Sequence, residues 1–232
     1  MKTRLAKQQT GFTILEAVLA LAIASMLVVV IAQFISASLS SNTREQTITL
    51  IQNNTRQAVG TVASSIRSAK SVEAVNSQPD SNSPGAPDNL YSWSSAAGSG
   101  TALILAIPAK DTTGSMIYID GSHNSLYTDD VIYYLDPVSK ILYRRLIANQ
   151  SAPNNAAVTT CPPTKATLTC PADAKVVEDI ANLTTAYFDA NNNAVTAPSG
   201  TEAIKITLTQ TKIIGIKTYS SSFTTIASLR NK

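Results

Sequence analysis

The sequence is short of the side chains on which most enzymes and metal sites depend. Its 232 residues include one histidine, His123, and two cysteines, Cys161 and Cys170. The chain has no His-Glu zinc motif, no glycine-rich phosphate loop and no nucleotide signature. His123 stands in a turn-like stretch, YIDGSHNS, where no specific nucleophile accompanies it. The sequence therefore predicts no catalytic site, no metal site and no cofactor, and the protein is not expected to be an enzyme.

Charge is scarce as well, since only 14% of the residues are charged. The formal net charge of +3 arises in the first eleven residues, where Lys2, Arg4 and Lys7 face no acids. The other 15 basic residues (these three taken from 18) balance the 15 acidic residues. Such a neutral body gives no broad electrostatic case for nucleic acid. Arg144 and Arg145 are neighbours on a predicted strand and point to opposite sides, which halves any local basic patch.

One long apolar run follows the basic start. From Ala17 to Ile35 the chain has 19 residues without a charge, Gly or Pro, enough for a helix of about 28 Å that crosses a bilayer. Because the basic residues precede it, the positive-inside rule leaves the N-terminus in the cytoplasm and exports the rest. A signal peptide cut near Ser36–Ser38 and a plain signal anchor are two interpretations. Neither accounts for Glu16, because a carboxylate at that depth costs on the order of 2–3 kcal/mol.

The stretch GFTILEAVLALAIA, which begins at Gly11, resembles the class III signal of type IV pilins and their relatives. The resemblance covers the first 35 residues or so. It implies that a prepilin peptidase cleaves after Gly11, that the new N-terminal residue Phe12 is N-methylated, and that Glu16 is retained. In a filament, Glu16 of one subunit then lies beside the Phe12 amine of another, as a device that sets register more than as a source of net stability.

Behind the apolar run the pattern becomes amphipathic, with apolar residues at steps of three or four. These positions are Ile48, Ile51, Thr55, Val59, Val62, Ile66 and Ala69. The expected organisation is a basic leader (1–11), the transmembrane part of a helix (12–37), its amphipathic continuation (38–75), a flexible loop (76–100) and a β-rich domain (101–232). No Pro or Gly interrupts the helix from Phe12 to Val59, which is more in keeping with minor pilins and pseudopilins than with major pilins.

The C-terminal half reads as a series of strands. In AIKITLTQ, Ile204, Ile206 and Leu208 point one way and the polar residues the other, as in a half-buried antiparallel strand. The runs expected as strands are TALILAIPA, SMIYID, DVIYYLD, KILYRRLIA, LTTAYFDA, EAIKITLTQ and IKTYSSSFTTIASLR. One long helix followed by an antiparallel sheet is an α+β fold, and it is the pilin plan.

The two cysteines flank a short loop, CPPTKATLTC. Outside the cytosol a Cys161–Cys170 disulfide is the default interpretation, with a pair of free thiols as the alternative. Closing so short a loop is worth roughly 2–3 kcal/mol in the chain-entropy model.

Acidic residues suggest calcium at two places without a full ligand set. The stretch DANNNAV (Asp189–Val195) resembles the start of a calcium loop, but it has Ala194 and Gly200 where such a loop needs Gly and Glu. A β-turn is therefore expected there. A second group is interpreted as solvated loop acids; it comprises Asp111, Asp120, Asp129, Asp130 and Asp136.

The C-terminal half also resembles PilW-like minor pilins and J-type minor pseudopilins, in VEDI…LTTAYFD, IKITL and the final ASLRN. This implies a structural subunit, a minor type IV pilin that helps to start pilus assembly. The partners implied are the prepilin peptidase, other minor and major pilins, the assembly platform with its ATPase, and the membrane. The expected location is the cytoplasmic membrane, and later the pilus, cell surface or periplasm. The alternatives are a minor pseudopilin of type II secretion and a conventionally anchored surface adhesin.

Overall fold

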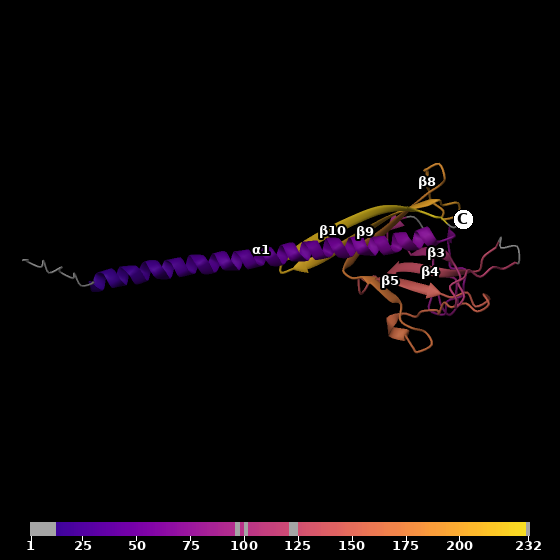
Figure 1. Ribbon diagram of the computed structural model, residues 1–232, viewed down its shortest axis with the longest axis horizontal. Coiled ribbons are helices and arrows are strands. Elements are labelled where there is room, and N and C mark those ends of the chain that lie inside the picture. The colour runs from indigo at the N-terminus through magenta and orange to yellow at the C-terminus, as the bar shows by residue number, and fades with distance from the viewer. Residues whose placement is uncertain (1–12, 96–97, 100–101, 121–124, 231–232) are drawn as a thin grey trace, which may run out of the picture. The chain divides into compact units, whose positions relative to one another are not determined.

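The computed structural model describes residues 13–95, 98–99, 102–120 and 125–230. One long helix precedes a set of antiparallel strands (Figure 1), so the α+β class is confirmed. The chain divides into two compact units, Met1–Thr47 and Ile48–Lys232.

The described part of the first unit is helical from Ile14 onward. Helix α1 runs from Ile14 to Ser68, and its N-terminal part is exposed from Ala17 to Ile35, where only Ser25 and Gln33 are polar. By length and composition this helix is able to cross a membrane. An apolar stretch that the rest of the described chain does not cover is compatible with membrane anchoring.

The second unit begins with the amphipathic part of α1. The side chains of Ile51, Thr55, Val59, Val62 and Ile66 are all buried, as the spacing predicts. Of these, Val59, Val62 and Ile66 pack in one core with apolar residues of both sheets. Burying each large aliphatic side chain contributes about 1.5–3 kcal/mol, so tertiary packing stabilises this part of the helix.

The helix ends earlier than the predicted Val75. Its last residue is Ser68, and the backbone N–H of Lys70 donates to the carbonyl of Ala106 at 2.8 Å. Residues 71–72 form strand β1 on the edge of a sheet. The apolar spacing continued past Ser68 because the following buried residues face the same core, but their backbone pairs with a strand instead of with the helix.

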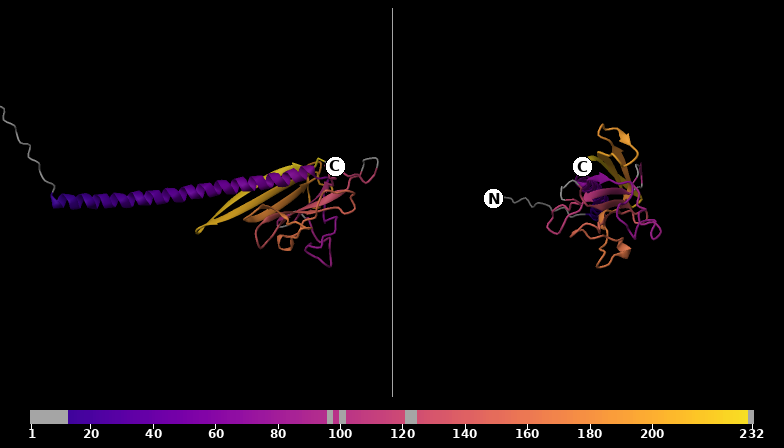
Figure 2. Two further views of the ribbon diagram at one scale, coloured as in Figure 1. Left: turned by 60° about the horizontal axis from the view of Figure 1, so that its bottom comes forward. Right: turned by 90° about the vertical axis from the view of Figure 1, so that its right-hand side faces the viewer.

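The strands form two antiparallel sheets where one was expected. The first has the order β1-β3-β4-β5-β6, and the second has the order β10-β9-β7-β2 with β8 paired to β7. In Figure 2 the yellow β9–β10 hairpin is distinct from the pink and orange strands of the first sheet. The bounds are β1 Ser71–Val72, β2 Gly98–Ser99, β3 Leu103–Pro108, β4 Thr128–Leu135, β5 Leu142–Ile147, β6 Ala174–Val177, β7 Ile180–Phe188, β8 Ala194–Val195, β9 Ala203–Ile214 and β10 Lys217–Ser228, with a 3-10 turn η1 at Pro163–Lys165.

Most predicted strands are confirmed, and one is wrong. In β9, Ile204, Ile206 and Leu208 are all buried, as the alternation predicts. SMIYID is not a strand, because Met116 and Tyr118 each take part only in an isolated bridge. Apolar content suggested a strand there, but this segment lies outside the two ladders.

Candidate functional site

The motif that carries the family resemblance lies at the start of the described chain. Gly11 and Phe12 fall outside the described residues. Thr13 precedes the first helical residue, and its hydroxyl accepts the N–H of Glu16 at 3.3 Å. Glu16 in turn accepts the backbone N–H and the hydroxyl of Thr13, both at 3.5 Å. This reciprocal arrangement is a capping box, with long and therefore weak hydrogen bonds.

The capping box gives Glu16 a local role that sequence reasoning missed. The pattern T-x-x-E ahead of an apolar run is itself the signal for such a box. Satisfying one N–H at a helix start is worth about 1 kcal/mol, and a carboxylate also suits the positive end of the helix dipole. Glu16 is exposed in the single chain, so its carboxylate is accessible to a second partner.

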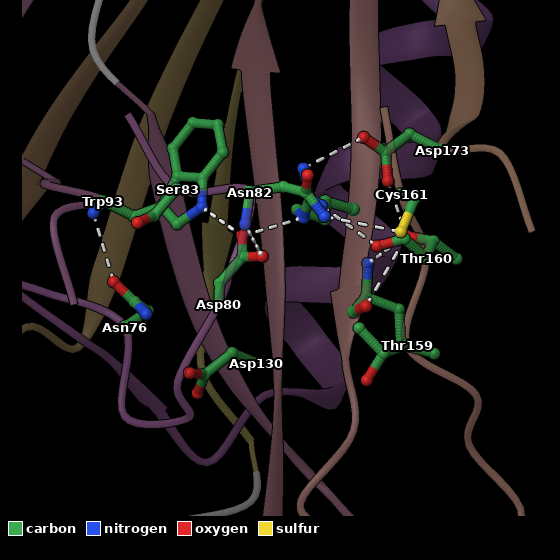
Figure 3. Close-up of polar contacts among 12 residues, drawn as sticks. Asn76, Asp80, Asn82, Ser83, Trp93, Asp130, Thr159, Thr160, Cys161 and Asp173 are labelled. Atoms are coloured by element: carbon green, nitrogen blue, oxygen red, sulfur yellow. Dashed lines mark hydrogen bonds and ion pairs between the residues drawn. The ribbon is translucent and has the colours of Figure 1, made fainter. Parts of the chain in front are cut away.

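A buried ionic cluster is the main polar feature of the second unit (Figure 3). The guanidinium of Arg145, on β5, is completely buried. Its Nε lies 3.0 Å from Oδ2 of Asp80, and its Nη1 lies 3.4 Å from Oδ2 of Asp173. The Nε–H is not aimed at the Asp80 oxygen, so this contact is electrostatic and not a directed hydrogen bond. We call Arg145, Asp80 and Asp173 the buried triad.

Neutral groups also donate hydrogen bonds to the two acids, in part to the same Oδ2 atoms that Arg145 contacts. The indole N–H of Trp93 donates to Asp80 at 2.7 Å. The hydroxyls of Tyr134 and Thr160 donate to Asp173 at 2.7 and 2.6 Å. Burial first, and then its hydrogen bond to Asp173, raises the pKa of Tyr134 well above the ordinary value. This tyrosine therefore stays protonated and keeps donating.

The triad joins three segments that are distant in the sequence. Asp80 belongs to the loop of residues 76–95, Arg145 to the first sheet, and Asp173 to the segment that follows the disulfide loop. A buried ion pair contributes little net stability compared with apolar packing, but removing one partner leaves an uncompensated charge. We expect the triad to fix how these segments meet.

The loop that was expected to be flexible makes internal hydrogen bonds at several of its described residues up to 95. Asp130 of β4 is fully buried and accepts the backbone N–H groups of Ser77 and Gln78 at 2.6 and 2.8 Å, together with the Ser77 hydroxyl at 2.8 Å. Burial raises the pKa of the Asp130 carboxyl despite these hydrogen bonds. The composition of the loop is that of a turn region, and the polar side chains which suggested flexibility instead make internal hydrogen bonds.

Asp129 and Asp130 correct the prediction of solvated acids. Asp129 is buried and accepts the backbone N–H of Asn149 at 2.8 Å and the side-chain amide of Asn155 at 2.7 Å. Among the described residues no group of three or more His, Cys, Asp or Glu is placed to hold a metal ion. His123 lies outside them.

Two other predictions, a turn at Asp189 and opposite directions for Arg144 and Arg145, are confirmed. Asp189 accepts the backbone N–H groups of Asn191 and Asn193 at 2.9 and 2.8 Å, in the turn between β7 and β8. Arg145 is buried whereas Arg144 is half-buried among the residues of a different cavity. The two arginines therefore do not form a shared basic surface.

Beside the triad lies an open cavity of about 460 Å³. The ring of Tyr134 is 4.9 Å from that of Trp93 and 5.6 Å from that of Tyr143, centroid to centroid. Three prolines, Pro84, Pro162 and Pro163, also line it. These side chains supply apolar surface to the cavity.

Cys161 and Cys170 form a disulfide, with their Cα atoms 5.5 Å apart. The bond closes the loop that contains η1. Asp173 donates its backbone N–H to the carbonyl of Cys161 at 2.7 Å, so the disulfide lies next to one acid of the triad.

Replacing both cysteines by serine is expected to lower the free energy of unfolding by about 2–3 kcal/mol, because the unfolded chain regains loop freedom. Urea unfolding of the oxidised protein and of this variant, followed by the fluorescence of the single Trp93, measures the change. Equal gel mobility with and without reductant, together with two thiols titrated in the unfolded unreduced protein, would contradict the disulfide.

No protein-family model matches the chain, and no curated protein matches it either.

Proposed function

We propose that this protein is a minor type IV pilin, a structural subunit that acts in the assembly and initiation of the pilus. The observation that carries the proposal is GFTILE, directly followed by an apolar helix. In the sequence, Gly11 is the proposed cleavage point, Phe12 the new N-terminus and Glu16 the retained acid. Helix α1 then continues through 55 residues and packs on a β-rich unit, which supports a pilin-type arrangement.

The proposed cleavage is compatible with the capping box. Cutting after Gly11 leaves the peptide bond between Phe12 and Thr13 intact, so Thr13 keeps the backbone N–H that Glu16 accepts. Cleavage also creates an α-amino cation at Phe12. In this proposal the carboxylate of Glu16 caps its own helix in the free subunit and pairs with the Phe12 amine of a neighbour in the filament, where both charges are desolvated.

The segments of the chain indicate the proposed order of membrane insertion, processing and assembly. It is inserted in the cytoplasmic membrane with its N-terminus inside, processed by prepilin peptidase, and drawn into the pilus by other minor and major pilins and the assembly platform with its ATPase. The second unit, with its disulfide, is then outside the cytoplasm, where oxidising conditions suit it. No enzymatic activity and no nucleic-acid binding are proposed.

A minor pseudopilin of type II secretion is the second candidate. The absence of Pro and Gly from Phe12 to Val59 favours minor pilins and pseudopilins equally. Genes for a secretin and secretion components beside this one would favour type II secretion, and genes for pilus retraction would favour the pilus. A conventionally anchored surface adhesin is the alternative from another class.

Mass spectrometry of the mature protein tests the proposal against the conventional anchor. We expect an N-terminus at Phe12 that carries one methyl group, because the basic leader is removed after Gly11. A mature protein that begins at Met1, or after Ser38, would overturn the pilin proposal and leave an anchored or secreted surface protein.

A further inference from the structure

The turn between β9 and β10 is unusually apolar for a hairpin tip. Its residues run Lys212, Ile213, Ile214, Gly215, Ile216 and Lys217. Ile213 is 71% exposed and Ile216 is 99% exposed. Ile214 pairs with Lys217, so Gly215 and Ile216 form a two-residue loop, and Gly215 has φ +61°. Glycine suits the first position of such a turn, which explains Gly215 but not Ile216. We call residues 212–217 the hairpin tip.

Folding alone does not explain the isoleucines of the hairpin tip. Turn positions favour Gly, Asn, Asp and Ser, which make local hydrogen bonds or tolerate unusual backbone angles. The β7–β8 turn of the same unit follows this rule, with Asp189 accepting hydrogen bonds from Asn191 and Asn193. By contrast Ile216 leaves an entire aliphatic side chain in water. Its burial against another surface would recover the hydrophobic free energy that folding leaves unused.

The charges that flank the isoleucines indicate what kind of surface would cover them. Lys212 and Lys217 enclose the isoleucines, and a hydrogen bond to Asp179 raises the pKa of Lys212. Lys217 is exposed. The Nζ of Lys212 lies 2.6 Å from Oδ2 of Asp179, so its charge is already paired within the unit. An apolar end next to the exposed cation of Lys217 matches the boundary of a bilayer, where aliphatic groups enter the acyl region and a lysine remains among anionic head groups.

The position of the hairpin tip within the second unit also favours a contact with a membrane. Gln210, a short distance before the tip on β9, accepts the hydroxyl proton of Thr55 in α1 at 2.9 Å. Thr55 is near the end of the unit at which the helix enters it from the apolar run. Figure 1 shows β8 at the opposite end of β9. A protruding turn also cannot enclose a small molecule, whereas it can insert into the head-group region of a bilayer.

We propose that the hairpin tip inserts Ile213 and Ile216 into the head-group region of an anionic membrane as a second contact beside the helix. The contact goes beyond the proposed pilin function. It rests on the anchoring of α1 in a membrane and not on filament assembly, so the N-terminal processing experiment and the following one can fail separately.

The chain provides a clean way to place one probe at the tip. Its two cysteines are joined to each other, so Ile216→Cys introduces a single free thiol for an environment-sensitive fluorophore. The full-length protein is reconstituted in vesicles of phosphatidylethanolamine and phosphatidylglycerol that contain lipids with a nitroxide near the head group. Ala190→Cys is the control, since Ala190 is exposed in the β7–β8 turn at the other end of β9.

The labelled tip should be quenched by the nitroxide lipids and protected from aqueous iodide, with the opposite result at the control position. A tip open to iodide and not quenched by lipid would overturn the proposal. Protection from iodide without quenching by lipid would also overturn it, because it would indicate docking on a second protein copy.

Two further variants of the labelled protein test the chemistry. Ile213→Ser should lower the ratio of inserted to free tip by about tenfold or more, which corresponds to the burial of one isoleucine. Ile226→Ser is its match, because Ile226 is also exposed, at 60%, but far from the tip on β10; it should change nothing. Lys217→Gln, or vesicles without phosphatidylglycerol, should lower the ratio by about fivefold per lost charge. Insertion indifferent to all of these changes would refute the inference.

Discussion

Glu16→Ala is expected to leave the protein in the membrane and to remove it from sheared filaments. The apolar run that drives insertion, Ala17 to Ile35, is untouched by the change. In the proposed filament, however, the variant leaves the Phe12 amine of a neighbour without its counter-charge in an apolar bundle. An uncompensated buried charge costs about 3–5 kcal/mol, so incorporation should fall by more than about a hundredfold.

The capping box makes a finer set of variants necessary. Glu16→Ala also removes a partner of Thr13, and cap loss alone costs about 1 kcal/mol. Glu16→Gln keeps a side chain that completes a capping box but carries no charge. Thr13→Ala removes the cap and keeps the charge. If charge pairing is decisive, Glu16→Gln should fail to incorporate and Thr13→Ala should be reduced only slightly.

Glu45→Ala is the matched control, because Glu45 is another exposed glutamate of the same helix and lies beyond the apolar run. Immunoblots of the membrane and sheared-filament fractions measure both steps for all four variants. Normal amounts of Glu16→Gln in filaments would refute the ion-pair account and leave Glu16 with the capping role only.

The sequence predicted the parts of the fold that depend on short-range pattern. Nineteen residues without a charge, Gly or Pro predicted a membrane-length helix, and the spacing of Ile51, Val59 and Ile66 identified the face that the structure buries. The alternation in β9 was as readable, because the period of a half-buried strand is two. These features need no knowledge of which segments meet.

Features that depend on long-range pairing were not predictable in this way. The end of α1 at Ser68 is set by pairing with β3, which is distant in the sequence. The division into two sheets and the positions of the short strands β1, β2 and β6 likewise depend on pairing between segments that are distant in the sequence. Local composition carries no information about a partner strand. For this reason the helix was predicted to run past Ser68, and SMIYID was predicted to be a strand.

The buried triad illustrates the same limit for the candidate site. Asp80 stands in a Pro-, Ser- and Asn-rich stretch, and Arg145 alternates with Arg144 on a strand. Each has the appearance of a surface residue in the sequence. Only the fold brings the guanidinium to both acids, and the fact that one arginine of an adjacent pair must face inward was the single available signal.

Arg145→Met should be among the most destabilising single substitutions in the second unit. Methionine fills much of the space of the arginine side chain, but it leaves Asp80 and Asp173, both buried, without their cation. Loss of one partner of a buried ion cluster costs about 3–5 kcal/mol, a large share of the 5–15 kcal/mol that holds a typical domain together. Urea unfolding of the full-length protein in non-ionic detergent, followed by Trp93 fluorescence, measures the loss at the residue that donates to Asp80.

Arg144→Met is the matched control on the same strand. Arg144 is half-buried and faces away from the triad, so its loss should cost about 1 kcal/mol or less. A third variant that combines Arg145→Met with Asp80→Asn and Asp173→Asn removes all three charges together. If the triad fixes how the segments meet without adding net stability, this variant should recover most of the stability lost in Arg145→Met. Equal destabilisation by Arg145→Met and Arg144→Met would show instead that the charges of the triad carry no special weight in the stability of the second unit.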